Sequence, residues 1–342
     1  MFDVSGFYPL LIIASLVGLT IVALTAGLTL IARPLGLLDY PNFRKHHDSE
    51  VPVVGGIAIY ITMVAFLSFI PLPNKLTWIL FSASIIVVVG ALDDIFNLSI
   101  KFRLLAQLTA TLTMIIGGKL WVQSVGFELI DEFIFFQWIT IPFTALAVIG
   151  LTNGFNMADG IDGLAAGYMM SGIATLCLSL FVVIGSVHQA VWMTVLFTAV
   201  LTFFLINMSL TPVSKVFLGD AGSLLLGFVM SWLLIYYTQR PHAYLQPVAA
   251  LWCVTIPVYD TIAVTIKRLR ERRSPFHPDR SHLHHFLIDR GCSQLATLWT
   301  ILVGSLVINI LGLVVTYSFS PLYSLVFYIL LLNIFVFFRI TR

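Results

Sequence analysis

Charged residues are scarce in this chain: they form 10% of its 342 residues, whereas hydrophobic residues form 59%. Together with a mean hydropathy of +1.00, this balance excludes a soluble domain and predicts a polytopic integral membrane protein. The net charge of only +2 argues against nucleic acid as a partner. The three cysteines, Cys177, Cys253 and Cys292, lack the spacing of a disulfide framework or a metal site.

A cleavable signal peptide is also missing from the N-terminal pattern. The first apolar run is too long for one, and no basic residue precedes it. We therefore expect this run to be the first membrane span. There are no low-complexity segments, and the longest polar segment is the loop at 267–294.

Apolar runs of roughly spanning length recur along the whole chain. They cover about residues 8–32, 53–70, 77–93, 103–118, 139–153, 164–186, 190–209, 222–238, 246–266, 295–317 and 321–339. The pattern predicts an all-α protein, with a single integral membrane domain over 1–342 and about eleven transmembrane helices. Because several runs are close to the lower length limit, ten helices are the alternative.

The loops between these runs differ in charge. If residue 1 lies outside, fifteen Lys and Arg residues fall on inner segments and three on outer ones, which are Lys75, Lys119 and Arg240. The positive-inside rule therefore predicts an outer N-terminus and an inner C-terminus. Twelve of the sixteen acids also fall on the inner side. Since carboxylates contribute little to orientation, we expect them to mark an active site at the inner, cytoplasmic face.

The most polar stretch lies between two long apolar runs, at residues 153–164. It contains Asn153, Asn156, Asp159, Asp162 and three glycines. A carboxylate at the centre of a bilayer costs about 2.5–3.5 kcal/mol, so the stretch is expected to form a turn at a membrane edge. Oxygen atoms on a sharply turning backbone suit hydrated Mg²⁺ or a phosphate-bearing ligand.

Two further groups of acids stand at predicted helix ends. Asp93 and Asp94 end the third run, and adjacent acids there need a counter-charge such as a divalent cation or Lys101. A polar helix cap is the alternative, although acids at a C-terminal end oppose the helix dipole. Asp220 opens the eighth run among small residues, where free N–H groups favour anions. A simple cap with Ser223 is the alternative there.

Basic and histidine-rich segments follow on the same side. Residues 44–47 (RKHH) suit a lipid phosphate or a diphosphate, or are ordinary inner-face charge. Four histidines fall within nine positions at 277–285, but without a Cys partner or an HExxH motif they are a weak zinc signal. With the neighbouring arginines they better suit a diphosphate. Asp260, inside the ninth run, is expected to pair with Lys267 or Arg268.

Four motifs occur jointly and in order: DD at 93–94, NxxNxxDGxDGL at 153–164, VFLGDAGS at 216–223 and HLHH at 282–285. In this combination the chain resembles the polyprenyl-phosphate N-acetylhexosamine-1-phosphate transferases. PNFRKHH followed by VGG, and SPFHPDRSHLHH, look most like the bacterial undecaprenyl-phosphate N-acetylglucosaminyl-1-phosphate transferase branch of that family. The resemblance spans nearly the whole chain.

The resemblance implies transfer of N-acetylglucosamine-1-phosphate from UDP-GlcNAc to undecaprenyl phosphate, with release of UMP and with Mg²⁺ or Mn²⁺ as cofactor. Asp93 matches the acid that activates the lipid phosphate, and Asp94 matches its neighbour at the metal. Asp220 matches a principal metal ligand, and Asn156 a second polar contact near that metal. Direct attack and an aspartyl intermediate are both open.

The resemblance also implies which residues handle the substrates. Asp159 and Asp162 match the pair assigned to the nucleotide or substrate, and they complete the predicted catalytic set. His282, His284 and His285 match the motif placed near the diphosphate and the sugar. To these we add further expected phosphate or uridine contacts, which are Lys45, Lys101, Asn207 and Arg280.

Membership of this kind implies a multi-pass protein of the bacterial inner membrane, with its N-terminus in the periplasm. A homodimer is an open arrangement. One alternative is the same reaction with another UDP-N-acetylhexosamine, because no motif reads the sugar stereochemistry. An alternative of another class is a secondary transporter with Asp260 in an ion relay, although the chain has no obvious internal repeat and its acids gather at one face.

Overall fold

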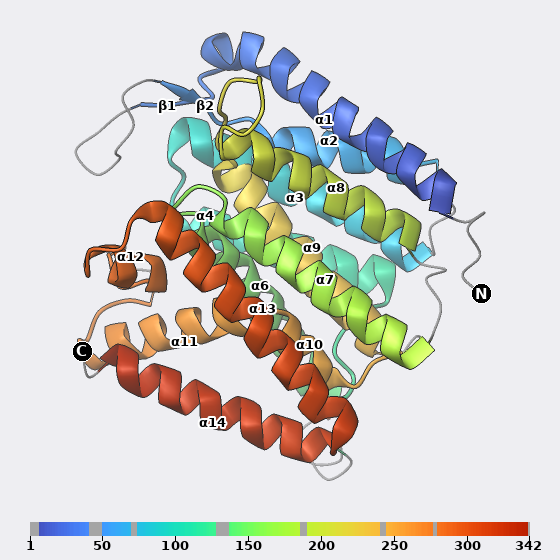
Figure 1. Cartoon of the computed structure of the whole chain (residues 1–342), viewed down its shortest axis with the longest axis vertical. Coiled ribbons are helices and arrows are strands. Elements are labelled where there is room, and N and C mark those ends of the chain that lie inside the picture. The colour runs from blue at the N-terminus through green and yellow to red at the C-terminus, as the bar shows by residue number, and fades with distance from the viewer. Residues whose placement is uncertain are drawn as a thin grey trace. The chain divides into compact units, whose positions relative to one another are not determined.

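A computed structural model of the chain describes residues 7–40, 50–69, 74–127, 137–184, 190–239, 244–275 and 279–340 (Figure 1). The described residues are helical apart from loops and one antiparallel pair of two-residue strands, β1 (Leu38–Asp39) and β2 (Val51–Pro52). The chain divides into two compact units, Met1–Gly118 with Val187–Leu226, and Lys119–Ser186 with Gly227–Arg342. The single domain over 1–342 stays a prediction.

The first unit contains the N-terminal helices and α8. Its helices are α1 (Phe7–Leu35), α2 (Gly55–Leu67), α3 (Asn74–Phe96), α4 (Ile100–Gly118), α8 (Ala190–Asn207) and the beginning of α9 (Gly219–Thr238). Here α1 packs along α8 and α3 packs along α4. Glycines allow close approach between these helices, because a Cβ on Gly90 of α3 would lie 2.4 Å from the Cα of Ala221 in α9.

The second unit contains the remaining helices. These are α6 (Gln137–Ala158), α7 (Leu164–Ile184), the rest of α9, α10 (Pro247–Cys253), α11 (Thr255–Arg270), α12 (Leu283–Ile288), α13 (Gln294–Ser318) and α14 (Pro321–Ile340). Trp252 and Tyr259 pack with Tyr328 in a buried aromatic core. Tyr259 OH in this core is satisfied, since it donates to the carbonyl of Tyr328 at 2.6 Å.

A sharp bend separates α10 from α11. The two helices meet at an angle of 81° across Val254. Pro257 lacks the N–H that a continuous helix would donate to the carbonyl of Cys253, so the local sequence favours this break. The bend gives α11 a direction of its own, and α11 carries both Asp260 and Arg268.

Eight of the described helices are long and apolar enough to span a membrane, and the α10–α11 pair makes nine if it counts as one span. The prediction of an all-α polytopic membrane protein is therefore confirmed. All eleven predicted apolar runs contain helix, but two of the helices, Gly55–Leu67 and Val191–Asn207, are shorter. With 13 residues, α2 is about 20 Å long, less than a hydrocarbon core of about 30 Å. The count of ten or eleven crossings and the orientation stay predictions.

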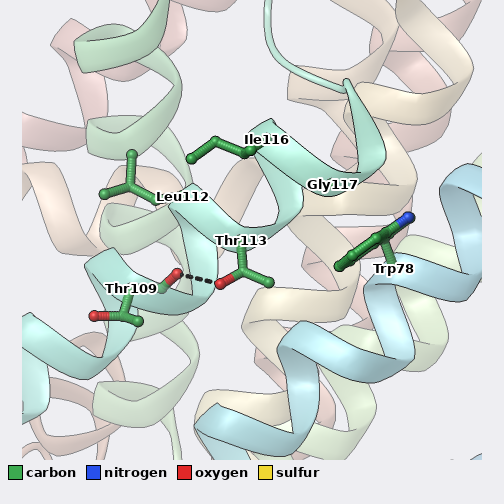
Figure 2. A pocket seen from close by; sticks show the side chains of 6 residues that line it. All are labelled: Trp78, Thr109, Leu112, Thr113, Ile116 and Gly117. Carbon is green, nitrogen blue, oxygen red and sulfur yellow. Dashed lines mark hydrogen bonds between the residues drawn. The ribbon is translucent and has the colours of Figure 1, made fainter.

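A groove of about 360 Å³ lies between α3 and α4 (Figure 2). It is lined by Trp78, Thr109, Leu112, Thr113, Ile116 and Gly117. The hydroxyl of Thr113 donates to the carbonyl of Thr109 at 2.8 Å, so it is already used within the helix. Since no charged side chain lines it, this groove does not suit an anionic substrate, and the candidate site lies elsewhere.

Candidate active site

The end of α3 is built around Asp93, which is 5% exposed. Its Oδ1 accepts the N–H of Leu98 at 2.6 Å, which tightens the turn that leads into α4. Its Oδ2 accepts from Arg103 Nη1 at 2.7 Å. Both carboxylate oxygens therefore have donors, and the buried charge has a counter-ion.

This counter-ion is Arg103 and not Lys101, which the sequence prediction had named. Lys101 is exposed. Successive residues of a helix differ by about 100° in direction, so positions 101 and 103 of α4 point to nearly opposite sides. The spacing after Asp93 and Asp94 was compatible with either residue, and only the start of α4 at Ile100 decides between them.

Backbone hydrogen bonds hold the loop before α9 against the start of α2. Phe217 N–H donates to the carbonyl of Pro52, and the N–H groups of Gly55 and Gly56 donate to the carbonyls of Phe217 and Leu218 at 3.0 Å. The loop leads into Gly219, the first residue of α9, whose φ of +73° is a conformation that side-chain-bearing residues rarely adopt. These contacts set the direction in which α9, and with it Asp220, begins.

The side chain of Asp94 binds the first turn of α9. Its Oδ1 accepts the N–H of Asp220 at 2.8 Å and its Oδ2 the N–H of Ala221 at 3.2 Å. Asp94 is therefore the capping group of a helix that starts 125 residues later in the chain. Arg103 Nη1 also lies 3.5 Å from Asp220 Oδ2. We name Asp93, Asp94, Arg103 and Asp220 the acid cluster.

The acid cluster contains three carboxylates and one guanidinium, which leaves two negative charges when all are ionised. Neighbouring carboxylates favour a divalent cation, and their hard oxygen atoms are the ligands that Mg²⁺ and Mn²⁺ prefer. Across the described ranges, no three His, Cys, Asp or Glu side chains are already arranged to hold a metal ion. The carboxylate oxygens of the acid cluster therefore suit such an ion. Arg103 contacts two of the three acids.

The polar stretch at 153–164 contains the predicted turn, which belongs to the second unit. It connects α6 to α7 through residues 159–163, and Gly163 has a φ of +77°. Asp159 is exposed, whereas Asn156 and Asp162 are half-buried. Asn156 and Asp220 lie in different units, so their shared metal stays a prediction.

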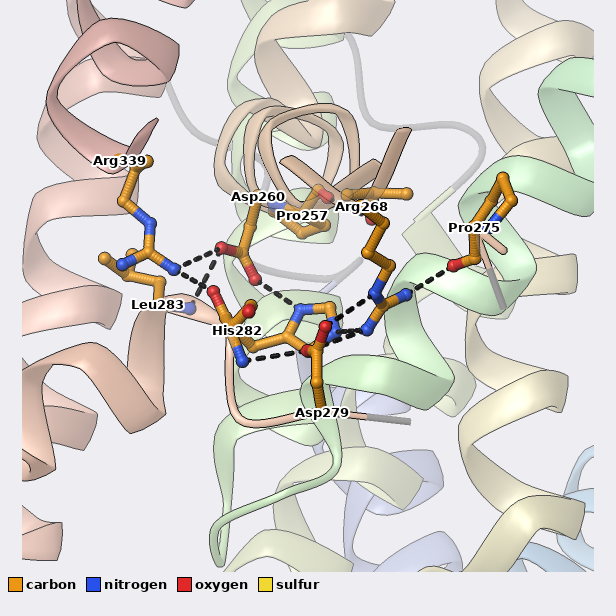
Figure 3. A network of polar contacts seen from close by, with 10 residues as sticks. Pro257, Asp260, Arg268, Pro275, Asp279, His282, Leu283 and Arg339 are labelled. Carbon is orange, nitrogen blue, oxygen red and sulfur yellow. Dashed lines mark hydrogen bonds and ion pairs between the residues drawn. The ribbon is translucent and has the colours of Figure 1, made fainter. Parts of the chain in front are cut away.

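A second cluster of polar side chains surrounds Asp260 on α11 (Figure 3). His282 Nδ1 lies 2.8 Å from Asp260 Oδ2, and the N–H of Leu283 donates to Oδ1 at 2.9 Å. Arg339 from α14 lies 3.6 Å from Oδ1. The sequence prediction that Lys267 or Arg268 pairs with Asp260 was wrong, because the partners come from distant segments that a local pattern does not reveal.

Arg268 instead binds Asp279. Its Nε and Nη2 donate to the two carboxylate oxygens at 2.9 and 3.0 Å, a bidentate pair between largely buried groups. Burial acts to raise the pKa of Asp279, but the hydrogen bonds from Arg268 and Ser281 outweigh it and hold that pKa well below its usual range. We call residues 279–288, which begin at this pair, the histidine segment.

His284 of the histidine segment lies against the turn between α6 and α7. It is 2% exposed, and a Cβ on Gly160 would lie 2.2 Å from its Nε2. Burial, and then the nearby charges of His285 and His282, lower the pKa of His284 to about 3. His284 is therefore a neutral imidazole at physiological pH. Burial also lowers the pKa of His285. The structure thus brings together the turn and the histidines that the sequence placed near substrate.

The remaining predicted contacts have structural partners or lie outside the described residues. Asn207 Nδ2 donates to the carbonyl of Val216 at 2.9 Å and so supports the loop before Asp220. Arg280 forms an exposed ion pair with Asp289 at 2.8 Å. Lys45 lies outside the described residues. A substrate contact by any of the three stays a prediction.

Five charged residues of the two clusters were missing from the predicted site. They are Arg103, Asp260, Arg268, Asp279 and Arg339. The bidentate pair of Arg268 with Asp279 spans eleven residues, and its only signal was that both lie in the basic loop predicted at 267–294. Arg339 reaches the carbonyl of Ser281 from 58 residues away, a contact without a local signal.

These features describe a membrane protein with a carboxylate cluster suited to phosphate chemistry. Its sequence is similar to those of known proteins. The glycosyl transferase family 4 model matches residues 76–238, which include the acid cluster and the turn at 159–163. The undecaprenyl-phosphate alpha-N-acetylglucosaminyl 1-phosphate transferase of Escherichia coli K12 is 35% identical over 295 residues, covering 84% of this chain and 78% of its own.

Two further relatives agree. The protein of the same name from Salmonella typhi is 36% identical over 293 residues, which are 83% of this chain and 78% of the relative. The probable undecaprenyl-phosphate N-acetylglucosaminyl 1-phosphate transferase of Bacillus subtilis is 32% identical over 304 residues, 88% and 82% of the two chains. The chain belongs to glycosyl transferase family 4. Membership of an enzyme family argues against the alternative that the protein is a secondary transporter.

Proposed function

We propose that this protein transfers N-acetylglucosamine-1-phosphate from UDP-GlcNAc to undecaprenyl phosphate and releases UMP. The observation that carries the proposal is the acid cluster, in which the Asp94 carboxylate accepts the backbone N–H of Asp220 and Arg103 contacts Asp93 and Asp220. The names of the relatives supply the substrates. The same framework with another UDP-N-acetylhexosamine is the alternative.

The reaction joins two anionic substrates. In the net reaction an oxygen of the lipid phosphate becomes bonded to the β-phosphorus of the UDP-sugar, and the bond from that phosphorus to the oxygen of UMP breaks. The cluster's positive group is Arg103, which Asp93 holds by one oxygen. Arg103 is 26% exposed at its side chain, so it is available to a phosphate while Asp93 keeps it in place. A fixed guanidinium stabilises the charge of a phosphoryl group without reorganising.

A divalent cation completes this proposal. Asp94 and Asp220 would hold Mg²⁺ or Mn²⁺, because their oxygens are the hard ligands of the acid cluster. When bound, the ion supplies charge stabilisation for the diphosphate and for the leaving UMP. Asp94 meanwhile keeps its capping bonds to α9, so that the start of α9 and Asp220 stay fixed relative to α3.

For the second unit we propose substrate binding. Asp159 and Asp162 flank Gly160 in the turn that His284 approaches. An acidic pair suits the hydroxyl and amide donors of a nucleoside or sugar, and neutral imidazoles donate to phosphate oxygens without titrating at physiological pH. His285 is half-buried beside His284, with ring centroids 4.2 Å apart.

The location of the protein is part of the proposal. We infer that it lies in the bacterial inner membrane with its N-terminus in the periplasm, because fifteen of its eighteen basic residues fall on the segments assigned to the cytoplasm. UDP-sugars are then delivered from the cytosol and the polyprenyl chain from the bilayer. Eleven crossings place the two termini on opposite sides, as this orientation requires, whereas ten crossings would place the C-terminus in the periplasm.

The test is a donor panel. Purified protein is incubated with Mg²⁺, undecaprenyl phosphate and one of several UDP-sugars, and UMP release is measured. We expect release with UDP-GlcNAc and its loss in Asp93→Asn and Asp220→Asn. Glu50→Gln is the matched control, because Glu50 is an acid of the first unit in an exposed pair with Arg33. A folded wild-type protein that releases no UMP with any UDP-N-acetylhexosamine contradicts the proposal.

A further inference from the structure

Asp260 is a buried acid that the acid cluster does not explain. It lies on α11 and is 8% exposed. A carboxylate in such a position is stable only when hydrogen bonds and opposite charges offset its desolvation. Among the described residues, these come from two places, the histidine segment and Arg339 of α14 (Figure 3). The position of Asp260 is therefore tied to that of the histidine segment.

His282 is held at both of its ring nitrogens. Nδ1–H donates to Asp260 Oδ2 at 2.8 Å, which leaves Nε2 as an acceptor facing Arg268 Nη2 at 3.5 Å. His282 is 6% exposed. A neutral imidazole has one donor and one acceptor, so His282 has neither left for a ligand. His282 is therefore an anchor of the segment, and its contact with substrate stays a prediction.

The same segment is fastened at further points. Asp279 binds Arg268 through both oxygens and also accepts the N–H of Ser281 at 2.9 Å. Arg339 donates to the carbonyl of Ser281. Residues 279–283 are thus held by α11 and α14 through buried or half-buried charges. Among the described residues of α11 and α14 that hold the segment, Asp260, Arg268 and Arg339, Asp260 alone accepts both from a side chain and from a backbone N–H of the segment.

His284 is the next residue of the histidine segment. Its backbone comes directly after Leu283, whose N–H Asp260 accepts, and its ring occupies the space beside Gly160. The Nε2 of His284 is buried and has no hydrogen-bond partner among the described residues. The stacked rings of His282 and His284 are 6.1 Å apart and nearly parallel, with 7° between their planes. A shift of His282 therefore moves His284 relative to the turn at 159–163.

We propose that Asp260 is a positioning residue: by fixing His282 and Leu283 it holds His284 against the Gly160 turn. It acts through the histidine segment and does not touch the substrates. Its effect on turnover rests on the proposed function, because His284 and the turn are proposed to bind the donor. Its effect on the order of the histidine segment does not rest on the proposed function.

The test has one structural and one kinetic readout. Hydrogen–deuterium exchange is measured by mass spectrometry on peptides that cover residues 279–288, in wild type, Asp260→Ala, Asp260→Asn and His282→Ala. We expect exchange in these peptides to rise about tenfold or more in Asp260→Ala and His282→Ala, since each loses a buried hydrogen bond of the segment. Exchange in α13 and α7 should match wild type.

Kinetics then separate positioning from a merely structural effect. In Asp260→Ala, kcat/KM for UDP-GlcNAc should fall while KM for undecaprenyl phosphate is retained. The double variant Asp260→Ala/His282→Ala should be no worse than the poorer single variant, because both act through one contact. Asp260→Asn, which keeps one acceptor oxygen at the same volume, should show a smaller rise in exchange and retain more activity.

The matched control is Glu271→Gln, an exposed acid paired with Arg273 just after α11. It should leave both readouts at the wild-type level. Wild-type exchange of residues 279–288 in a folded Asp260→Ala variant would overturn the proposal, as would additive kinetic losses in the double variant. If the wild type itself releases no UMP, the proposed function fails, and the exchange experiment still decides the role of Asp260.

Discussion

Replacement of Gly56 by alanine is the sharpest available test of how the acid cluster is held. Gly56 is the second residue of α2, and a Cβ there would stand 2.1 Å from the nitrogen and 2.2 Å from the Cα of Gly222 in α9. Both are backbone atoms, so no side chain can rotate away. One of the two helices must move.

The size of the movement follows from contact distances. Carbon atoms pack at about 3.5 Å or more, so the added methyl group requires a displacement of roughly 1.3 Å, the difference from 2.2 Å. Gly222 is two residues from Asp220, in the same first turn of α9. Overpacking of this kind costs about 1–3 kcal/mol of stability. A displacement of about 1 Å at a reacting group costs about 100-fold in rate.

The assay compares Gly56→Ala with Gly27→Ala. Gly27 lies within α1 of the same unit, and nothing lies within 4 Å of a Cβ at that position. Thermal unfolding in detergent should show a lower midpoint for Gly56→Ala and an equal or higher one for Gly27→Ala, since alanine favours the helix. UMP release should fall about 100-fold in Gly56→Ala alone. Wild-type turnover and stability in Gly56→Ala would refute the argument that this close approach positions Asp220.

Three further predictions concern single groups. Asp94→Ala should lower the free energy of unfolding by about 1–2 kcal/mol, because two N–H groups of α9 lose their acceptor. Asp94→Asn should cost less stability than Asp94→Ala but lose as much turnover. Wild-type turnover in Asp94→Asn would limit the role of Asp94 to capping. Arg103→Gln should destabilise by about 3 kcal/mol, because Asp93 stays buried without its counter-ion. Arg103→Lys should recover part of the loss in the same unfolding assay. As pH falls from about 6.5 toward 3, His284 binds a proton in the unfolded state but stays neutral in the folded state, where its pKa is about 3. The free energy of unfolding should therefore fall by about 1.4 kcal/mol per pH unit. His284→Gln should reduce that slope, and an unchanged slope would contradict the buried neutral imidazole.

The helical architecture followed from composition and hydropathy, because lipid requires every backbone group of a span to be satisfied within its own helix. The acids of the first cluster were also predictable. Asp93, Asp94 and Asp220 stand out since carboxylates at the ends of apolar helices are costly and need a reason. Their chemistry could be inferred before their geometry was known.

The partners of those acids could not be predicted in the same way. Whether Lys101 or Arg103 faces Asp93 depends on where α4 begins, and a shift of one residue rotates every side chain by about 100°. The capping of α9 by Asp94 joins residues 126 positions apart. Asp260 was matched to basic residues within one or two turns, whereas its actual partners arrive from the histidine segment and from α14. Such contacts are set by tertiary packing, for which local spacing carries no signal.

The central claim is that the sugar and its phosphate move as one group. Wild-type protein is given undecaprenyl phosphate and UDP-GlcNAc that carries tritium in the sugar and phosphorus-32 in the β-phosphate, and the lipid product and the released nucleotide are separated. We predict that both labels enter the lipid in equal amounts and that the nucleotide is UMP. Tritium in the lipid without phosphorus-32, with release of UDP, would contradict the account.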